Sequence, residues 1–195
     1  MLTRDHLADA GARLVRVDGL DALSLRAVAA ALDVTPMALY RHVDDADDLT
    51  LAVLDRLLAA LPDVPAGGPW PDRYRRWAHA ARAALTPYPG LARHVLQHWT
   101  ELDRPLAVVE QLLGARDDVA AANAVFTYVL MRVDAEQAIR AAGTVQRRLR
   151  RLGPDHPRLR ANAAQYAVAR FDEHFAHGLD ALLLGLAKGP ARARA

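Results

Sequence analysis

The sequence contains no cysteine, which excludes disulfide bonds, thiolate metal sites and cysteine nucleophiles. It also lacks any run of about 18 apolar residues, the length that a membrane-spanning helix needs, and its first ten residues lack the layout of a signal peptide. These absences predict a cytoplasmic protein with no membrane partner. Hydrophobic residues still make up 52% of the 195 residues, enough to bury one sizeable core or a small module joined to a larger one.

Lysine and glutamate are nearly absent from the charged residues. Lys188 is the only lysine beside 24 arginines, and four glutamates stand beside 19 aspartates. Residues 1–48 hold five arginines and nine aspartates, a net charge of −4, whereas the remaining 20 basic and 14 acidic residues leave +6. Because phosphate neutralisation supplies much of the affinity of proteins for DNA, the acidic N-terminal part does not by itself favour DNA binding.

Residues 24–43, SLRAVAAALDVTPMALYRHV, contain two short helical patterns separated by a break of three residues. Each pattern places apolar residues on one face, and in the second Leu39 and Val43 stand four residues apart. Two short helices across a tight turn form a helix-turn-helix, whose second helix enters a DNA major groove. The pattern therefore predicts a helix-turn-helix with a recognition helix over Pro36–His42.

The end of this stretch, VTPMALYRHV, resembles the recognition helix of the TetR family of transcriptional regulators, which typically ends in Leu-Tyr, a variable residue, and His or a similar residue. Two positions depart from the family pattern: Asp33 replaces the usual glycine, and Ala46 replaces a lysine that touches a DNA phosphate. The resemblance implies a helix-turn-helix domain over residues 1–46, a C-terminal ligand-binding and dimerisation domain over residues 47–188, and a flexible tail over residues 189–195.

Helical spacing continues along the chain and no segment needs a strand, so the predicted fold class is all-α. We expect helices over residues 4–17, 24–32, 45–61, 71–85, 91–102, 105–113, 119–142 and about 162–187. The arginine-rich segment 147–160 is predicted to be a charged loop, with nucleic-acid binding as the less favoured alternative.

The outward face of the recognition helix carries the predicted base contacts. With Leu39 directed inward, Met37 and Arg41 point away from the core, and an arginine can bind a guanine edge bidentately. The predicted DNA-binding residues are Arg26, Thr35, Pro36, Met37, Ala38, Tyr40, Arg41 and His42. The alternative is an ordinary solvated helix face, and for His42 packing competes equally with phosphate contact.

The last helix and residues 119–142 carry apolar strips that must be buried against another surface. The resemblance implies that two C-terminal helices of each subunit form a four-helix bundle, which spaces two recognition helices over a palindromic operator. The predicted dimer-interface residues are Val125, Phe171, Phe175, Leu179, Leu182 and Leu186. The alternative is that these strips pack inside one domain.

The resemblance also implies a cavity for a small-molecule effector of unknown identity. The predicted wall residues are Trp77, His94, His98, Trp99, Tyr128, Met131 and Arg132, each of which can alternatively be plain core or surface. His94, His98 and Glu101 share a helix face and can in principle hold a metal, but a solvated cluster is favoured, so no metal or other cofactor is predicted. Arg132 and Glu136 interrupt an apolar strip and should be paired. Three alternatives carry equal weight: pairing across the dimer, a place in the pocket wall, or a position where the helix reaches the surface.

These observations predict a ligand-responsive repressor that acts as a homodimer on double-stranded DNA. No nucleotide-binding loop or Ser-His-Asp motif is present, so an enzyme is not expected. Two alternatives stay open. One is a TetR-like ligand-binding module that has lost operator binding, which the acidic N-terminal part and Ala46 favour. The other is a small helical metalloenzyme built on His94, His98 and Glu101.

Overall fold

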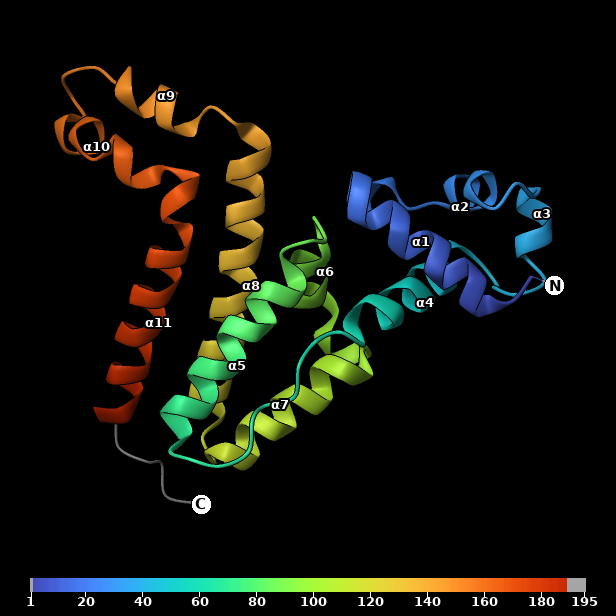
Figure 1. Ribbon diagram of the computed structural model, residues 1–195, viewed down its shortest axis with the longest axis horizontal. Helices are drawn as coiled ribbons and strands as arrows, with labels where there is room; N and C mark the ends of the chain where they lie inside the picture. Colours follow the sequence, from blue (N-terminus) through green and yellow to red (C-terminus); the bar gives the residue numbers. More distant parts are fainter. Residues whose placement is uncertain (1, 189–195) are drawn as a thin grey trace.

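The computed structural model describes residues 2–188, and every regular element in that range is helical (Figure 1). The elements are α1 (Arg4–Asp18), η1 (Leu20–Ala22), α2 (Leu25–Ala31), α3 (Pro36–Leu39), α4 (Ala46–Leu58), α5 (Trp70–Leu85), α6 (Leu91–His98), η2 (Trp99–Glu101), α7 (Asp103–Ala115), α8 (Val119–Ala142), α9 (Val145–Arg150), α10 (Pro157–Ala161), η3 (Ala163–Tyr166), η4 (Val168–Arg170) and α11 (Phe171–Lys188). The predicted all-α class is confirmed, and no described helix is long and apolar enough to cross a membrane.

In the N-terminal unit α1 packs against both α2 and α4, and α2 packs against α3. Thr3 caps α1, because its hydroxyl oxygen accepts from the amide of His6 at 3.2 Å. A Cβ added to Gly11 of α1 would collide with the Val53 side chain of α4, so α1 and α4 pack in close contact. Val17 is 79% exposed, so the buried face of α1, which includes Leu7, Ala10 and Val15, ends before it.

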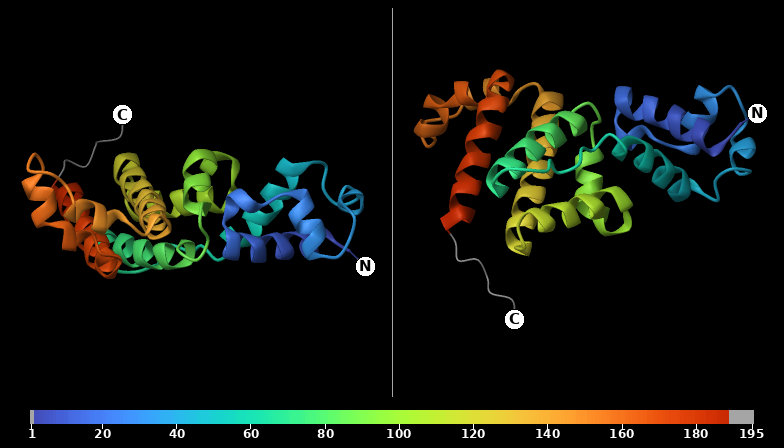
Figure 2. Two further views of the ribbon diagram at one scale, coloured as in Figure 1. Left: turned by 90° about the horizontal axis from the view of Figure 1, so that it is seen from above. Right: turned by 60° about the horizontal axis from the view of Figure 1, so that its bottom comes forward.

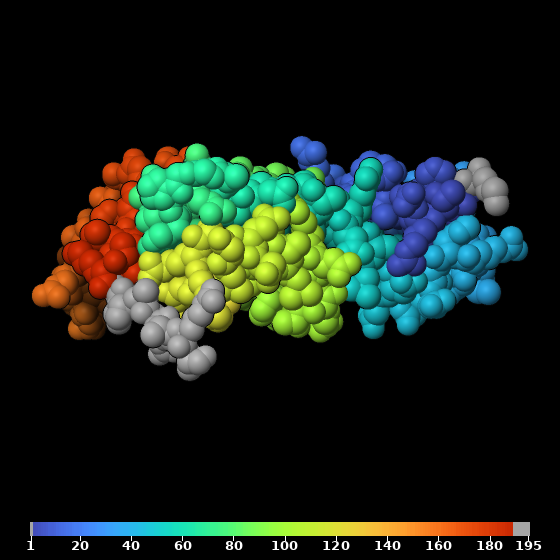
Figure 3. All heavy atoms as spheres, turned by 90° about the horizontal axis from the view of Figure 1, so that it is seen from below, coloured from blue at the N-terminus to red at the C-terminus, as the bar shows by residue number. Residues whose placement is uncertain are grey.

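The regulatory domain is built around α5 and α8, with α6, α7 and α11 around them (Figures 1 and 2). The indole of Trp77 on α5 stacks on Phe126 of α8 with ring centroids 6.1 Å apart. Seen from below, α4 fills the space between the N-terminal helices and α7 (Figure 3). The predicted boundary after residue 46 falls at the first residue of α4, and α4 packs against both α1 and α7.

Three predicted boundaries are wrong. The last helix begins at Phe171 rather than near Asn162, because the chain before it turns to pack against α9: η3 contacts α9 with Ala163 buried, and η4 follows it. Segment 147–160 folds into α9 and α10 rather than a loop. Helix α3 ends at Leu39, and a hydrogen-bonded turn continues to Val43. The predicted tail, 189–195, lies outside the described residues.

Candidate DNA-binding site and its link to the regulatory domain

The turn between α2 and α3 sets the direction of the recognition helix. Ser24 caps α2 by accepting from the amide of Ala27 at 3.1 Å. Asp33 has a φ of +54°, the left-handed conformation that usually favours glycine. Thr35 occupies the N-cap of α3 without a side-chain hydrogen bond to it, so its hydroxyl group stays free to meet a phosphate.

The two faces of α3 differ sharply in exposure. Leu39 is 0% exposed and Val43 is 2% exposed, and both belong to the core. On the opposite face Met37 is 73% exposed and Tyr40 is 48% exposed, and Arg41 is exposed beside them. The structure thus places the predicted base-reading residues on one accessible face. Arg26, Thr35 and Pro36 are also exposed, whereas Ala38 and His42 are half-buried.

The acidic residues next to α3 are partly engaged within the protein. Asp45 caps α4 by accepting from the amide of Asp48 at 2.8 Å. Asp48 in turn accepts from the Arg4 guanidinium at 2.8 Å and from the amide of Asp44 at 3.0 Å. The hydrogen bond from Arg4 lowers the pKa of Asp48 to about 2, so this carboxylate stays ionised and paired. Ala46 is exposed, and no lysine stands at that position.

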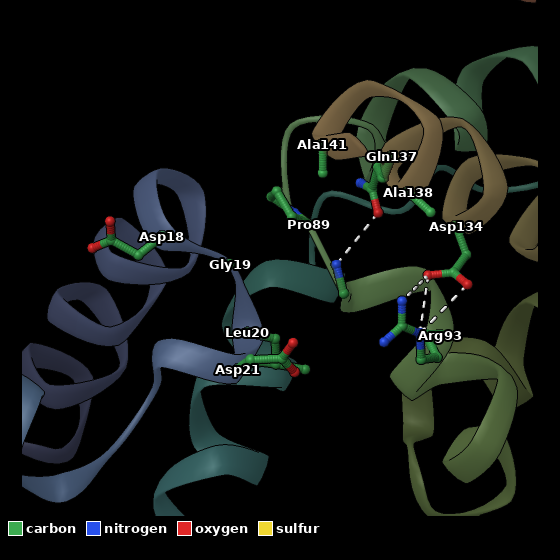
Figure 4. Close-up of a pocket in the computed structure, with 11 residues that line it drawn as sticks. Asp18, Gly19, Leu20, Asp21, Pro89, Arg93, Asp134, Gln137, Ala138 and Ala141 are labelled. Carbon is green, nitrogen blue, oxygen red and sulfur yellow. Dashed lines mark hydrogen bonds and ion pairs between the residues drawn. The ribbon is translucent and has the colours of Figure 1, made fainter. Parts of the chain in front are cut away.

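The loop between α5 and α6 joins the N-terminal unit to the regulatory domain (Figure 4). The amide of Leu20 in η1 donates to the carbonyl of Pro89 at 2.9 Å. Gly90 follows with a φ of +86°, and an added Cβ would lie 3.2 Å from the Leu20 side chain. A substitution at this glycine would therefore be strained in the backbone and crowded against η1.

Gln137 of α8 holds this loop in place. Its amide nitrogen lies 3.4, 3.1 and 3.2 Å from the carbonyl oxygens of Leu85, Thr86 and Tyr88, to which it donates. Its oxygen accepts from the amide of Gly90 at 3.3 Å. One side chain of α8 thus positions the loop that touches the N-terminal unit.

A cleft of about 180 Å³ lies beside this loop, between η1 and α8. Asp18 and Asp21 line its N-terminal side, and Arg93 and Asp134 form an ion pair at 3.1 Å on the other side. The two domains are therefore joined at the loop by few direct contacts, with open space next to them. The sequence carried no signal for Gln137, because a single glutamine on a helix does not reveal which loop it bonds.

Comparison with known proteins identifies the family. The model of bacterial regulatory proteins of the tetR family matches residues 7–53, and the model of the tetracyclin repressor-like C-terminal domain matches residues 61–189. The chain belongs to the TetR family. It is a DNA-binding transcriptional regulator of the ligand-responsive, homodimeric kind that this family comprises.

Individual relatives agree with the family. An HTH-type transcriptional regulator of Saccharopolyspora erythraea is 30% identical over 205 residues, which cover 96% of this chain and 85% of the relative. A possible TetR family regulator of Streptomyces coelicolor A3(2) superposes with a TM-score of 0.82 at 28% identity and covers 94% of this chain and 98% of its own. BioQ bound to its double-stranded DNA operator superposes with a TM-score of 0.70 at 26% identity. The match covers 97% of this chain and 100% of BioQ.

The predicted dimer strip of this TetR-family chain needs a correction. Val125, Phe175 and Leu179 are 0% exposed and Phe171 is 3% exposed within one protomer, so these four side chains form its core. The hydroxyl group of Tyr128 donates to the carbonyl of Phe175 at 2.8 Å, which fastens α11 to α8 of the same chain. Leu182 and Leu186 pack half-buried against the same core.

The predicted effector-pocket residues fall into separate groups: Trp77 and Trp99 both lie against Phe126, and the two histidines lie against each other. Trp77 is 1% exposed and donates to the carbonyl of Pro62 at 3.2 Å, whereas Met131 is 57% exposed on the far side of α8. Tyr128 packs against α11, and Trp99 lies beside Phe126. The two predicted histidines share an opening, a cleft of about 290 Å³ lined by Asp47, Thr50, Leu51, His94, His98 and Glu101.

The histidines in that cleft stack on each other. The rings of His94 and His98 lie with centroids 4.5 Å apart, and His98 is 3.5 Å from the Glu101 carboxylate. Burial, followed by the neighbouring His98, lowers the pKa of His94, which favours the neutral ring. Within residues 2–188 no group of three or more such side chains is arranged to hold a metal ion.

The expected pairing of Glu136 is confirmed, with a partner that the sequence did not suggest. Glu136 is 2% exposed and accepts from Arg82 of α5 at 2.8 Å and from Arg132 at 3.3 Å. Arg82 also reaches Asp172 of α11 at 2.8 Å. The charges interrupting the apolar strip of α8 thus join three helices of one protomer rather than two subunits.

Replacing Asp33 by glycine should stabilise the protein. Glycine adopts a positive φ without the steric cost that an L-residue bears, so we expect the free energy of unfolding to rise by about 0.5 kcal/mol. Asp33→Asn is the matched control, because asparagine removes the charge while keeping a side chain in the same conformation. Chemical denaturation measures both. A lower stability of Asp33→Gly than of Asp33→Asn would contradict the account of this turn.

Proposed function

We propose that this regulator reads a palindromic operator with the exposed face of α3 and represses transcription until an effector binds. The observation that carries the proposal is the contrast across α3, with Leu39 at 0% and Met37 at 73% exposure. A helix held by a buried side chain and exposed on its other face suits a major groove. Regulation of this kind needs no catalytic step or cofactor, and its place is the cytoplasm, where the DNA lies.

The exposed face of α8 supports a new assignment of the dimer interface. Its members recur every three or four residues, are small or apolar, and carry no charge. Ala120, Met131, Ala135 and Ala138 are exposed, and Ala124 and Thr127 between them are half-buried. This heptad-like spacing is the pattern by which two helices pack against each other. On α11 the exposed positions His177, Ala181, Leu184 and Lys188 follow the same spacing, and Leu184 is 59% exposed. We assign these two faces to the homodimer.

The link at Gln137 supports a route from effector to DNA. Because α8 carries both the proposed dimer face and Gln137, the partner subunit, the α5–α6 loop and η1 are connected through one helix. An effector that shifts α5 or α6 against α8 would change the contact of Pro89 with Leu20 and thus the separation of the recognition helices. Effector and operator are then coupled through two conformations, each of which binds one ligand better.

In the proposed docking Arg41 contacts a base and Arg26 contacts a phosphate, so their substitutions should have different effects. Arg41→Ala should weaken the free energy of operator binding by about 1–3 kcal/mol and relax the preference for one base, because it removes a base contact. Arg26→Ala should weaken binding to all sequences alike, because it removes a phosphate contact. The slope of log affinity against log salt should also become shallower by about one unit. A salt titration by fluorescence anisotropy measures both effects. Unchanged operator affinity in both variants would show that α3 does not dock in this way.

A further inference from the structure

The segment between α8 and α11 concentrates positive charge. Residues 144–161 hold six arginines and one aspartate, a net charge of +5, whereas the whole chain carries +2. The arginines are Arg147, Arg148, Arg150, Arg151, Arg158 and Arg160, and all six are exposed. We call them the α9–α10 arginines.

These arginines differ from most others in lacking a carboxylate partner. Within residues 2–188, nine other arginines form salt bridges, for example Arg4 with Asp48 and Arg104 with Asp63. None of the α9–α10 arginines does so in that range, and Asp155, the one acidic residue among them, forms no salt bridge. Their guanidinium groups are therefore available to an outside anion.

The arrangement of charge is unfavourable for an isolated helix. Arg147 precedes Arg150 by three residues and Arg151 by four, the spacing at which like charges on a helix repel. Open clefts of about 350 and 450 Å³ lie between these side chains, and both are lined by Arg147 and Arg151. A polyanion lying across them would relieve the repulsion, and the planar guanidinium matches the geometry of phosphate.

The charge of the N-terminal part favours DNA over another polyanion. Figure 1 shows α9 and α10 at the upper left of the molecule and α2 and α3 at its right-hand end, so a contact at α9 and α10 lies apart from the recognition helix. Residues 1–48, which read the bases, carry a net charge of −4 and supply little phosphate neutralisation. We infer that the α9–α10 arginines form a second DNA contact, which binds the phosphate backbone outside the base-reading contacts of α3 and without regard to sequence. This goes beyond the proposed function, which requires α3 alone.

The test removes three of these charges. Arg147→Gln/Arg150→Gln/Arg151→Gln should weaken binding to the operator and to a random-sequence duplex by the same factor, on the order of tenfold at about 50 mM salt. The slope of log affinity against log salt should fall by about two to three units, because each phosphate contact contributes about 0.9. Since these side chains are exposed and unpaired, the melting temperature should stay unchanged or rise.

The control removes three positive charges from α5, outside both the α9–α10 arginines and the proposed dimer faces: Arg73→Gln/Arg75→Gln/Arg76→Gln should leave the slope nearly unchanged. Arg41→Ala gives the independent reference for α3. An unchanged slope in the α9–α10 variant, with base preference still relaxed in Arg41→Ala, would overturn this inference and leave the proposed function intact. So would loss of poly-glutamate binding in the α9–α10 variant with unchanged DNA affinity, which would identify an acidic protein as the partner.

Discussion

Met131→Asp should convert the homodimer to a monomer. Met131 is 57% exposed in the protomer and lies in the middle of the uncharged face of α8, so the substitution places one unpaired charge from each subunit inside the proposed interface. An uncompensated buried charge costs about 3–5 kcal/mol, which raises the dissociation constant of the dimer by at least about 100-fold. Sedimentation velocity at several protein concentrations measures the change.

Operator binding should fall with the dimer, because a monomer engages one half-site and loses the effective concentration of the second. That gain from linking two sites is about 10²–10⁴-fold. Val119→Asp is the matched control, since Val119 is 64% exposed at the first residue of α8 and lies off this face. If Met131→Asp stays as dimeric as Val119→Asp, the interface lies elsewhere on the chain.

Gln137→Leu should loosen the N-terminal unit from the regulatory domain. The variant loses the donor to three loop carbonyls and the acceptor for the amide of Gly90. A buried polar group left unpaired lowers the free energy of unfolding by about 1–3 kcal/mol. For this half-buried set we expect the free energy of unfolding to fall by about 2–4 kcal/mol in total. Hydrogen exchange at the amides of Leu20 and Gly90 should become faster, because the Pro89 carbonyl no longer has a fixed position.

Gln111→Leu separates this effect from a general loss of stability. Gln111 also holds a loop, accepting from the amide of Val64 at 2.7 Å and donating to Asp63 at 2.8 Å, but that loop does not touch η1. We expect both variants to be destabilised, and only Gln137→Leu to change exchange at Leu20 and operator affinity. Equal exchange at Leu20 in the two variants would remove Gln137 from the coupling route.

The helix-turn-helix was predictable because its signals are local. Ser24 and Pro36 mark the helix starts, Asp33 adopts the left-handed turn, and Leu39 with Val43 fixes the buried face. Each of these features depends on residues a few positions apart. The boundaries of α8, Val119–Ala142, followed from the sequence for the same reason.

The dimer face was not predictable in this way. An apolar strip shows that a helix face is covered, but it does not show whether the cover belongs to the same chain or to a partner. Phe175 and Leu179 are covered by the protomer's own helices, whereas the proposed dimer face around Met131 consists mainly of alanines and has little hydrophobic signal. Contacts over long sequence separations, such as Arg82 with Glu136 and Gln137 with Gly90, leave no pattern in the sequence at all.

Selection of bound duplexes from a random-sequence pool by the full-length protein shows whether a dimer reads DNA through α3. We expect a palindromic consensus whose half-site centres lie about one helical turn, roughly 10 base pairs, apart. We also expect that Arg41→Ala relaxes the same position in both halves and that Met131→Asp fails to enrich the paired site. Enrichment of a single unpaired half-site by the wild type, or of no sequence, would contradict a dimer that reads DNA through α3.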